Sequence, residues 1–206
     1  AQPRLLVLQV AAVAAGISAK ASHRMWTEAA GSSRTRPSSA RNAERKRTSE
    51  LYYLDLRPSD DGVYTWTRLA ADGAVPAPRE GACAVFHEGC LMVFGGKGSS
   101  ARCNDLFFYD ASTNMWSQPT ATGSSPSPRC NAALAASEGM LFVHGGQANF
   151  LCQDLFALNL QEMLWREVPQ AGAVPGPVHH HTAAVHAGSL YIQGGINELG
   201  GANYTM

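Results

Sequence analysis

The chain has 206 residues, of which 45% are hydrophobic, and a formal net charge of zero, which is an ordinary composition for a packed globular protein. Residues 20–49 carry eight Lys or Arg against two acidic residues, whereas residues 50–206 carry seven basic and fourteen acidic residues. The acidic segment is therefore not expected to bind nucleic acid through its overall charge.

Residues 1–22 contain an apolar run from Leu5 to Ile17 that ends near Ala19-Lys20-Ala21. This ending fits the small-x-small rule for signal-peptide cleavage, but the run is too short and too rich in alanine to span a membrane. No initiator methionine is present, and the odd number of cysteines favours a reducing compartment. We therefore favour an alanine-rich helix, or a stretch from an incomplete gene model, over a signal peptide.

Residues 23–49 combine low hydrophobicity with high positive charge, which predicts a disordered linker. The basic run Arg41–Arg47 has two interpretations, a nuclear-import or polyanion-binding patch and a chance cluster in a linker. We favour the second. The domain division is thus an N-terminal apolar segment plus basic linker over 1–49, followed by a folded region over 50–206.

From residue 50 onward the sequence consists of short apolar runs separated by turn residues. These runs are about four residues long and rich in aromatics, so they predict strands rather than helices. Because successive residues are apolar, both faces of each sheet are expected to be buried, which favours sheets stacked radially in a β-propeller. The predicted strands are 51–54, 91–94, 106–109, 141–143 and 155–158.

Three kinds of marker recur with a period of 49 or 50 residues, which identifies an internal repeat. Proline pairs of the form Pro-x-Pro occur at 76–78, 126–128 and 175–177. Glycine doublets and single tryptophans advance by the same steps. The structural repeat residues are Trp66, Gly95, Gly96, Trp116, Gly145, Gly146, Trp165, Gly194 and Gly195.

These markers resemble the kelch repeat family. A kelch repeat has an apolar strand ending in Gly-Gly, an Asn-Asp-Leu strand ending in Tyr-Asp, a tryptophan six residues later and a Pro-x-Pro-Arg link. Residues 94–129 match this pattern nearly throughout. The last copy departs from it, because Val178 stands where arginine is expected. The histidine that the family often has three residues later is His181 there, but Ala82 and Ala132 in the earlier copies.

The resemblance implies an all-β fold, a kelch-type propeller of four-stranded antiparallel blades. With strands labelled A to D from inside to outside, residues 50–69 supply C and D of one blade. Residues 82–119 and 132–168 are two whole blades, and 181–195 supply A and B of another. This totals about three blades, whereas closed propellers have four to eight. We therefore expect an incomplete ring, as a fragment of a longer protein rather than as a dimer that completes a six-bladed ring.

Two local features are expected within each blade. The glycine doublets lack Cβ atoms, so we expect the repeat tryptophans to lie directly over their backbone. Asp110 and Asn114 are expected to bracket a tight turn.

Because strands alternate in direction, the B–C loops over 97–103, 147–153 and 196–202 should emerge on one face of the propeller. The D–A crossings that carry Arg79 and Arg129 should emerge on the same face. Loops on a rigid scaffold are the usual place for binding, and Phe150 is the best anchor candidate because its loop has no need of an aromatic residue. A phenyl ring folded back onto the next blade is the alternative for Phe150. For the two arginines the alternative is a structural hydrogen bond. The candidate partner-binding residues are Arg79, Lys97, Arg102, Arg129, Asn149, Phe150 and Asn197.

No metal, cofactor or catalytic residue is predicted. The five cysteines form no CxxC pair, so we expect reduced thiols rather than a disulfide framework or a zinc ribbon. Within the run from His179 to His181, only the first and last could share a ligand geometry, because successive strand residues point to opposite faces. Neither the copper and iron sites of some kelch-like propellers nor a common nucleophile or nucleotide motif can be matched.

The sequence thus predicts a non-catalytic protein-protein interaction scaffold or adaptor that binds a protein partner through propeller loops. A metal-dependent propeller enzyme is the alternative. We expect a cytoplasmic protein, with the nucleus as a second location and secretion disfavoured. No association with membrane is expected.

Overall fold

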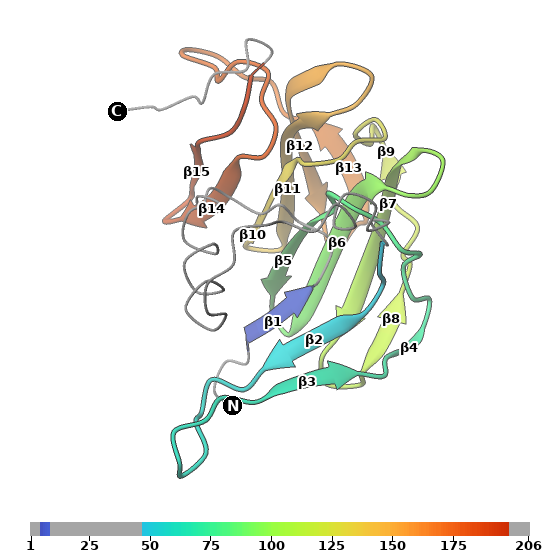
Figure 1. Ribbon diagram of the computed structural model, residues 1–206. Helices are drawn as coiled ribbons and strands as arrows, with labels where there is room; N and C mark the ends of the chain where they lie inside the picture. The colour runs from blue at the N-terminus through green and yellow to red at the C-terminus, as the bar shows by residue number, and fades with distance from the viewer. Residues whose placement is uncertain (1–4, 9–46, 198–206) are drawn as a thin grey trace, which may run out of the picture.

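The computed structural model describes residues 5–8 and 47–197, and every helix or strand assigned in these ranges is a β-strand. The strands form antiparallel sheets that follow one another in chain order, as the kelch resemblance implies (Figure 1). We name these sheets the first to fourth blades. The second blade contains β5 (Cys83–His87), β6 (Cys90–Lys97), β7 (Arg102–Asp110) and β8 (Met115–Ser117). The third contains β10 (Ala133–Ser137), β11 (Met140–Gln147), β12 (Leu151–Asn159) and β13 (Leu164–Glu167).

The two end blades contain fewer strands among the described residues. β14 (Thr182–His186) and β15 (Ser189–Gln193) form the A–B hairpin of the fourth blade. β2 (Leu51–Leu54) and β3 (Trp66–Leu69) are the C and D strands of the first. The innermost strands β5, β10 and β14 lie next to one another, so the blades fan out from a shared inner edge. The predicted all-β fold class, a propeller arc of antiparallel blades, is confirmed among the described residues.

One strand was not predicted. Leu5–Leu8, within the segment expected to be helical, forms β1 and pairs with β2 in the B position of the first blade. Leu5 pairs with Leu54 as Leu91 pairs with Tyr109 in the second blade, so the register is that of a normal blade. The backbone of Leu5–Leu8 pairs with an edge of β2 that would otherwise be unpaired. The remainder of the predicted linker, residues 9–46, lies outside the described residues.

Two short strands join neighbouring blades at their outer edges. β4 (Asp72–Gly73) leaves the first blade and pairs in parallel with β8 of the second. β9 (Thr122–Gly123) leaves the second blade and pairs in the same way with β13 of the third. These two D–A crossings are therefore hydrogen-bonded to the outer strands of the blades that they enter.

The hydrophobic core lies between blades. One cluster, between the first and second blades, includes Leu51, Val93 and Trp116. A larger cluster joins the second and third blades and includes Phe94, with Trp165 at a ring-centroid distance of 5.8 Å. Each buried tryptophan thus packs against the preceding blade. The second and third blades have apolar residues on both faces because each has a neighbour on both sides.

The expectation that tryptophans cover the glycine doublets is wrong. A Cβ atom added to Gly95 would lie 2.7 Å from the carbonyl oxygen of Arg129, and one added to Gly96 would lie 2.9 Å from the backbone nitrogen of Ala82. Both residues have positive φ, 64° and 95°. The doublet is needed because the next crossing approaches its backbone directly, with the Gly96 amide donating to the Arg129 carbonyl at 2.8 Å.

The predicted turn after β7 is present. The Asp110 carboxylate accepts hydrogen bonds from the Ser112 amide at 2.7 Å and from the Thr113 amide at 3.3 Å. Asn114 closes the turn with a φ of 60°, and its side-chain amide donates to the carbonyl oxygen of Ala70 at 2.9 Å. The hydrogen bonds from Ser112 lower the pKa of Asp110. The turn therefore also links the second blade to the first.

We predict that Gly96→Ala lowers the free energy of unfolding by about 3 kcal/mol, because it adds a steric clash to a positive φ. Gly89→Ala is the matched control, since Gly89 has a φ of 80° with nothing within 4 Å of an added Cβ. That control is expected to lose about 1 kcal/mol from backbone strain alone. Equal losses in chemical denaturation would contradict the close-approach account.

Candidate protein-interaction face

The B–C loops and the D–A crossings come together on one side of the blades. Isolated bridges connect Glu80 with Lys97, Cys130 with Gln147, and His179 with Ile196, so each crossing lies beside the start of a B–C loop. We call this side the loop face. It contains residues 97–103, 147–153 and 196–197 with the crossings that carry the two arginines. The predicted extension to residue 202 lies outside the described residues.

Arg79 lies inside the second blade rather than on the surface, with a relative exposure of 5%. Its guanidinium group donates to the Asp105 carboxylate at 2.6 and 3.0 Å and to the carbonyl oxygen of Gly95 at 2.9 Å. The group also stands over the Phe107 ring, 5.0 Å from its centroid. Arg79 therefore ties the crossing to the C strand and to the glycine doublet of the blade that follows.

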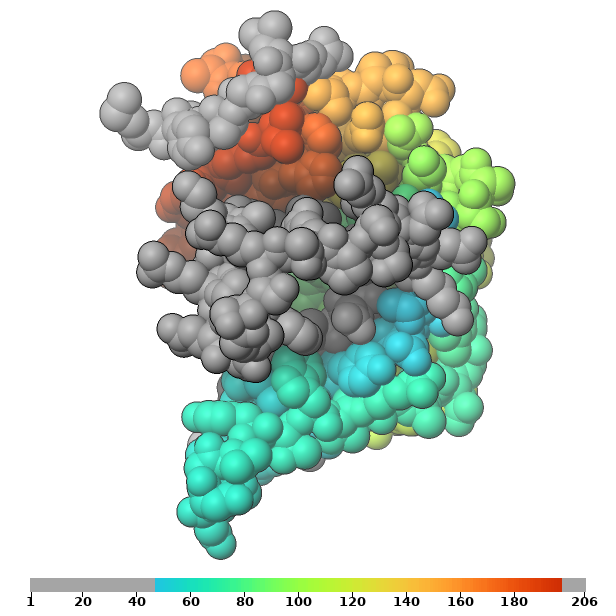
Figure 2. All heavy atoms as spheres, in the orientation of Figure 1, coloured from blue at the N-terminus to red at the C-terminus, as the bar shows by residue number. Residues whose placement is uncertain are grey.

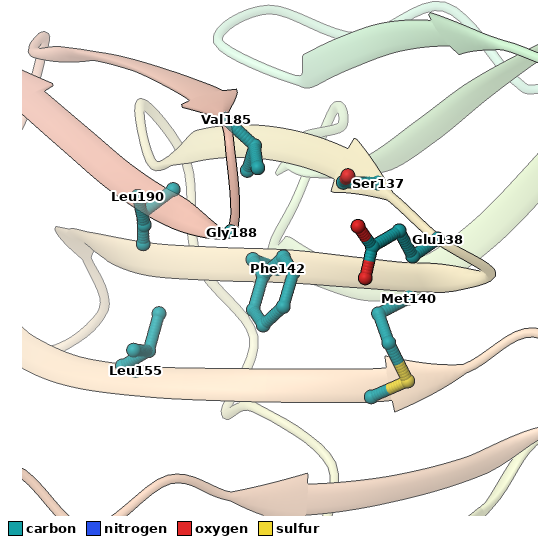
Figure 3. Close-up of a pocket in the computed structure, with 8 residues that line it drawn as sticks. All are labelled: Ser137, Glu138, Met140, Phe142, Leu155, Val185, Gly188 and Leu190. Atoms are coloured by element: carbon teal, nitrogen blue, oxygen red, sulfur yellow. The ribbon is translucent and has the colours of Figure 1, made fainter.

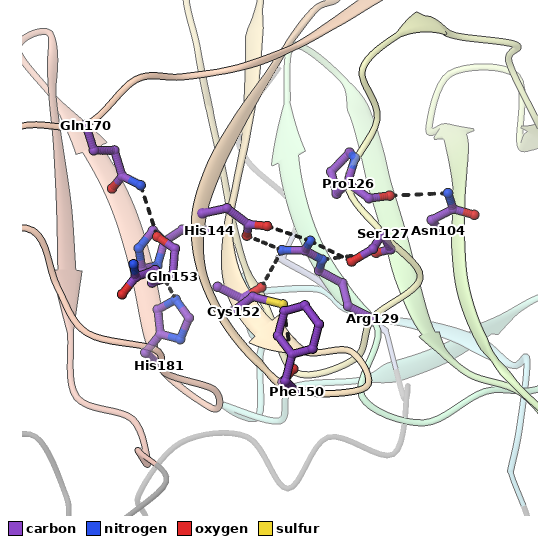
Figure 4. Close-up of polar contacts among 12 residues, drawn as sticks. Asn104, Pro126, Ser127, Arg129, His144, Phe150, Cys152, Gln153, Gln170 and His181 are labelled. Atoms are coloured by element: carbon purple, nitrogen blue, oxygen red, sulfur yellow. Dashed lines mark hydrogen bonds and ion pairs between the residues drawn. The ribbon is translucent and has the colours of Figure 1, made fainter.

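Arg129 repeats this arrangement one blade later and is 1% exposed. It forms an ion pair with Asp154 and donates to the Gly145 carbonyl at 3.0 Å and to the hydroxyl of Ser127 at 2.9 Å (Figure 4). For both arginines the geometry is the structural alternative that the sequence left open. Both guanidinium groups are buried and donate within the chain, so neither arginine belongs to the surface that a partner could reach.

The remaining predicted residues lie at the loop face with different exposure. Phe150 is 69% exposed, and Asn149 beside it is also exposed. Lys97 is exposed at the end of β6, whereas Arg102 and Asn197 are half-buried. The phenyl ring of Phe150 is therefore not folded back onto a neighbouring blade.

The fourth blade departs from the Arg–Asp pattern. Val178 is buried and keeps the backbone hydrogen bonds of Arg129, since its amide donates to Cys152 at 3.1 Å and its carbonyl accepts from Gly146 at 2.8 Å. Three residues later, His181 contacts His144 of the third blade, with Nε2 and Nδ1 2.9 Å apart. One interface earlier, the same positions hold Phe94 and Ala132.

This buried histidine pair was not predicted, although His144 replaces the phenylalanine of the preceding repeat in the sequence. The other ring nitrogens, Nε2 of His144 and Nδ1 of His181, have no hydrogen-bond partner among the described residues. Burial lowers the pKa of His144, and burial together with the neighbouring His144 lowers the pKa of His181 to about 4. Both rings are therefore neutral at neutral pH.

The metal hypothesis based on His179 and His181 finds no support in the geometry. His181 points to His144, whereas Nδ1 of His179 lies 2.7 Å from Nδ1 of His180. Across residues 5–8 and 47–197, no three His, Cys, Asp or Glu side chains gather closely enough to hold a metal ion. The same ranges include no helix that is long and apolar enough to span a membrane.

The five cysteines are free thiols. Burial raises the pKa of Cys83 to about 12 and that of Cys90 to about 11. Thiols with these pKa values are protonated at neutral pH and are poor nucleophiles and metal ligands.

We predict that Asp154→Asn lowers the free energy of unfolding by roughly 3 kcal/mol, because it leaves the buried Arg129 guanidinium without its countercharge. Chemical denaturation measures this loss. Glu162→Gln removes an exposed carboxylate from the same blade and is expected to change stability by no more than about 0.5 kcal/mol. Similar losses for the two variants would show that the buried pair is not important for stability.

The histidine pair predicts a loss of stability in acid. Burial lowers both pKa values from 6.5, so the folded state binds fewer protons than the unfolded state in acid. The free energy of unfolding is therefore unaffected by the pair above about pH 6.5 and falls as the pH decreases toward about 4. The double variant His144→Phe, His181→Ala introduces the Phe–Ala pair that the preceding interface has. It should lose less stability than the original chain between pH 7.5 and pH 5 in parallel denaturation curves. An unchanged pH dependence would exclude this role.

The comparisons with known proteins agree with this geometry. The chain is 43% identical over 56 residues to dynein regulatory complex subunit 7 of Chlamydomonas reinhardtii. The matched region is 27% of this chain and 4% of that protein, so the chain spans a small fraction of its relative's length. Residues 40–195 match the KLHDC2/KLHL20/DRC7 Kelch-repeats domain model. That match covers the second, third and fourth blades and the C and D strands of the first blade. The chain therefore belongs to the kelch-repeat family.

Proposed function

We propose that this chain is a non-catalytic protein-protein interaction module, a scaffold or adaptor that binds a partner through its loop face. Kelch repeat domains generally mediate protein-protein interactions, and that general role is the starting point. The observation that supports this particular face is the 69% exposure of Phe150, a large aromatic side chain on a loop between two well-packed strands. Aromatic residues of this kind are frequent energetic anchors of protein interfaces.

The short loop that carries Phe150 holds its backbone in place. The amide of Ala148 donates to the carbonyl oxygen of Phe150 at 2.9 Å, and Ala148 itself is buried. β11 and β12 pair directly on either side, with Gln147 opposite Leu151. A fixed backbone lowers the entropy that is lost on binding, so the ring is presented in a form suited to recognition.

Polar residues share the loop face with the proposed anchor. Asn149 precedes it, and Lys97 is exposed at the end of the corresponding strand of the second blade. A central aromatic with a polar rim is the usual composition of a protein-protein interface. The net negative charge of residues 50–206 makes a nucleic acid an unsuitable partner for this face.

For the partner, we propose a subunit of a multi-protein assembly in the cytoplasm. The relative named above is a subunit of the dynein regulatory complex, and the local similarity supports a comparable context for this chain. The proposal assigns no catalytic role, in keeping with the kelch repeat family, which is typically a non-enzymatic interaction module.

We predict that Phe150→Ala weakens partner binding by more than about tenfold without affecting folding, since the ring makes little contact within the chain. The tagged chain and its variants are purified from cells, and the proteins recovered with each are quantified by mass spectrometry. Phe86→Ala is the matched control, because Phe86 is also exposed, at 44%, but lies next to the A–B turn at the opposite end of its strand.

The two variants give opposite outcomes if the proposal holds. Proteins lost with Phe150→Ala should be retained with Phe86→Ala. A set of partners that is unchanged by Phe150→Ala, or that is lost equally with both variants, would contradict binding through the loop face.

A further inference from the structure

The loop face carries a row of positive charge on the first and second blades. Lys97 ends β6 and is directly opposite Arg102, the first residue of β7. Arg47 occupies the position of Arg102 in the first blade, counted back from the residue that pairs with each D-strand tryptophan. We call these three residues the cationic row. In the third blade the positions of Lys97 and Arg102 hold Gln147 and Leu151, so this charge belongs to the first two blades.

The charge and the hydrogen-bond donors of the cationic row are only partly satisfied. Glu80 forms an ion pair with Arg47 at 2.6 Å, whereas neither Lys97 nor Arg102 forms one among the described residues. Like charges at directly opposite positions of two strands repel each other. The Nε atoms of Arg47 and Arg102 are also buried without a partner in the described part of the chain, although buried donors are normally satisfied. An anionic group at this row would relieve both deficits.

The cationic row adjoins the proposed aromatic anchor. The crossing between the second and third blades is hydrogen-bonded to the backbone of Cys103 and of Gln147, so it joins the two B–C loops. Figure 2 shows these loops, residues 97–103 and 147–153, next to each other at the upper right of the molecule. Phe150 on the second loop is 69% exposed. Going from the second blade to the third, the loop face therefore changes from cationic to apolar.

The sequence that leads to this face adds charge of the same sign. Residues 9–46 connect β1 to Arg47 and contain seven Lys or Arg against two Glu, a net charge of +5. This segment lies outside the described residues and is not part of the proposed site. Its charge nevertheless favours the approach of a negatively charged partner over distances of about 10 Å and disfavours a basic one.

The open pocket between the third and fourth blades does not suit an acidic ligand. It has a volume of about 220 Å³ and is lined mainly by apolar side chains, among them Phe142 and Leu190 (Figure 3). Its charged residue is Glu138, which would repel a carboxylate. A peptide bound in this pocket would therefore not respond to a change at Lys97.

We propose that the partner binds the loop face through an acidic segment, whose side-chain carboxylates contact Lys97 and Arg102 while a neighbouring apolar residue contacts Phe150. This inference rests on the function proposed above and adds the chemistry of the partner. A carboxylate can accept hydrogen bonds from a guanidinium group in a bidentate manner, which suits Arg102. A protein segment is favoured over a nucleic acid, because residues 50–206 carry seven basic and fourteen acidic residues and would repel an extended row of phosphates.

The test begins with selection by the full chain from a phage library of random short peptides at about 50 mM salt, where electrostatic attraction is strong. The selected peptides should contain more Asp and Glu than the starting library, next to an aromatic or aliphatic residue. The most enriched peptide is then synthesised with a fluorescent label, and its affinity for each variant is measured by fluorescence anisotropy.

Lys97→Glu should weaken binding of this peptide by more than about tenfold, because it reverses a charge that contacts the ligand. Arg166→Glu is the matched control, since it makes the same change of charge at an exposed residue of the outer strand β13. The control should bind within about twofold of the original chain, because a distant exposed charge is screened by salt. Phe150→Ala, measured in parallel, reports separately on the proposed anchor.

The outcomes separate this inference from the function on which it rests. Selected peptides that lack acidic residues but lose affinity with Phe150→Ala would overturn the inference and leave the proposed function standing. Acidic peptides that depend on Lys97 but not on Phe150 would support the carboxylate contact and contradict the anchor. Equal effects of Lys97→Glu and Arg166→Glu, no enrichment of any peptide, or a single-stranded DNA oligonucleotide that binds more tightly than the peptide would each overturn the inference.

Discussion

The central constraint on this fold is that each blade is apolar on both faces and must be covered by a neighbour. Val93 and Phe94, adjacent in β6, are both fully buried, one in the cluster shared with the first blade and the other in the cluster shared with the third. A four-stranded sheet with such residues cannot bury them within itself. The stability of the second and third blades therefore depends on the interfaces between blades, as expected for stacked repeats.

Polar contacts fix the spacing of these interfaces. The glycine doublet allows the following crossing to approach the backbone, and a buried arginine then joins that crossing to an aspartate and a glycine carbonyl of its own blade. At the last interface the arginine is replaced by Val178, and a pair of neutral histidines replaces an aromatic–alanine contact. The contacts of this interface therefore depend on pH through the two histidines.

The sequence was sufficient to predict the blades, because the glycine doublets, tryptophans and proline crossings recur at fixed spacing. β1 was missed because Leu5–Leu8 lacks a following glycine doublet and residues 9–50 separate it from its partner strand. The burial of Arg79 and Arg129 could not be predicted as firmly, since arginine is usually exposed. Their partners Asp105 and Asp154 are distant in the sequence and come close only in the folded chain. The exposure of Phe150 and of Trp66 likewise depends on which surfaces have neighbours.

Hydrogen exchange under mildly denaturing conditions tests the mutual dependence of the blades most directly. The strand-paired amides of β6, β7, β11 and β12 report on the second and third blades. If neither blade is stable without the other, these amides lose protection together, with the same free energy of opening and the same dependence on denaturant. Retained protection in one blade after the other has exchanged would show that the blades are independent units and would contradict the account.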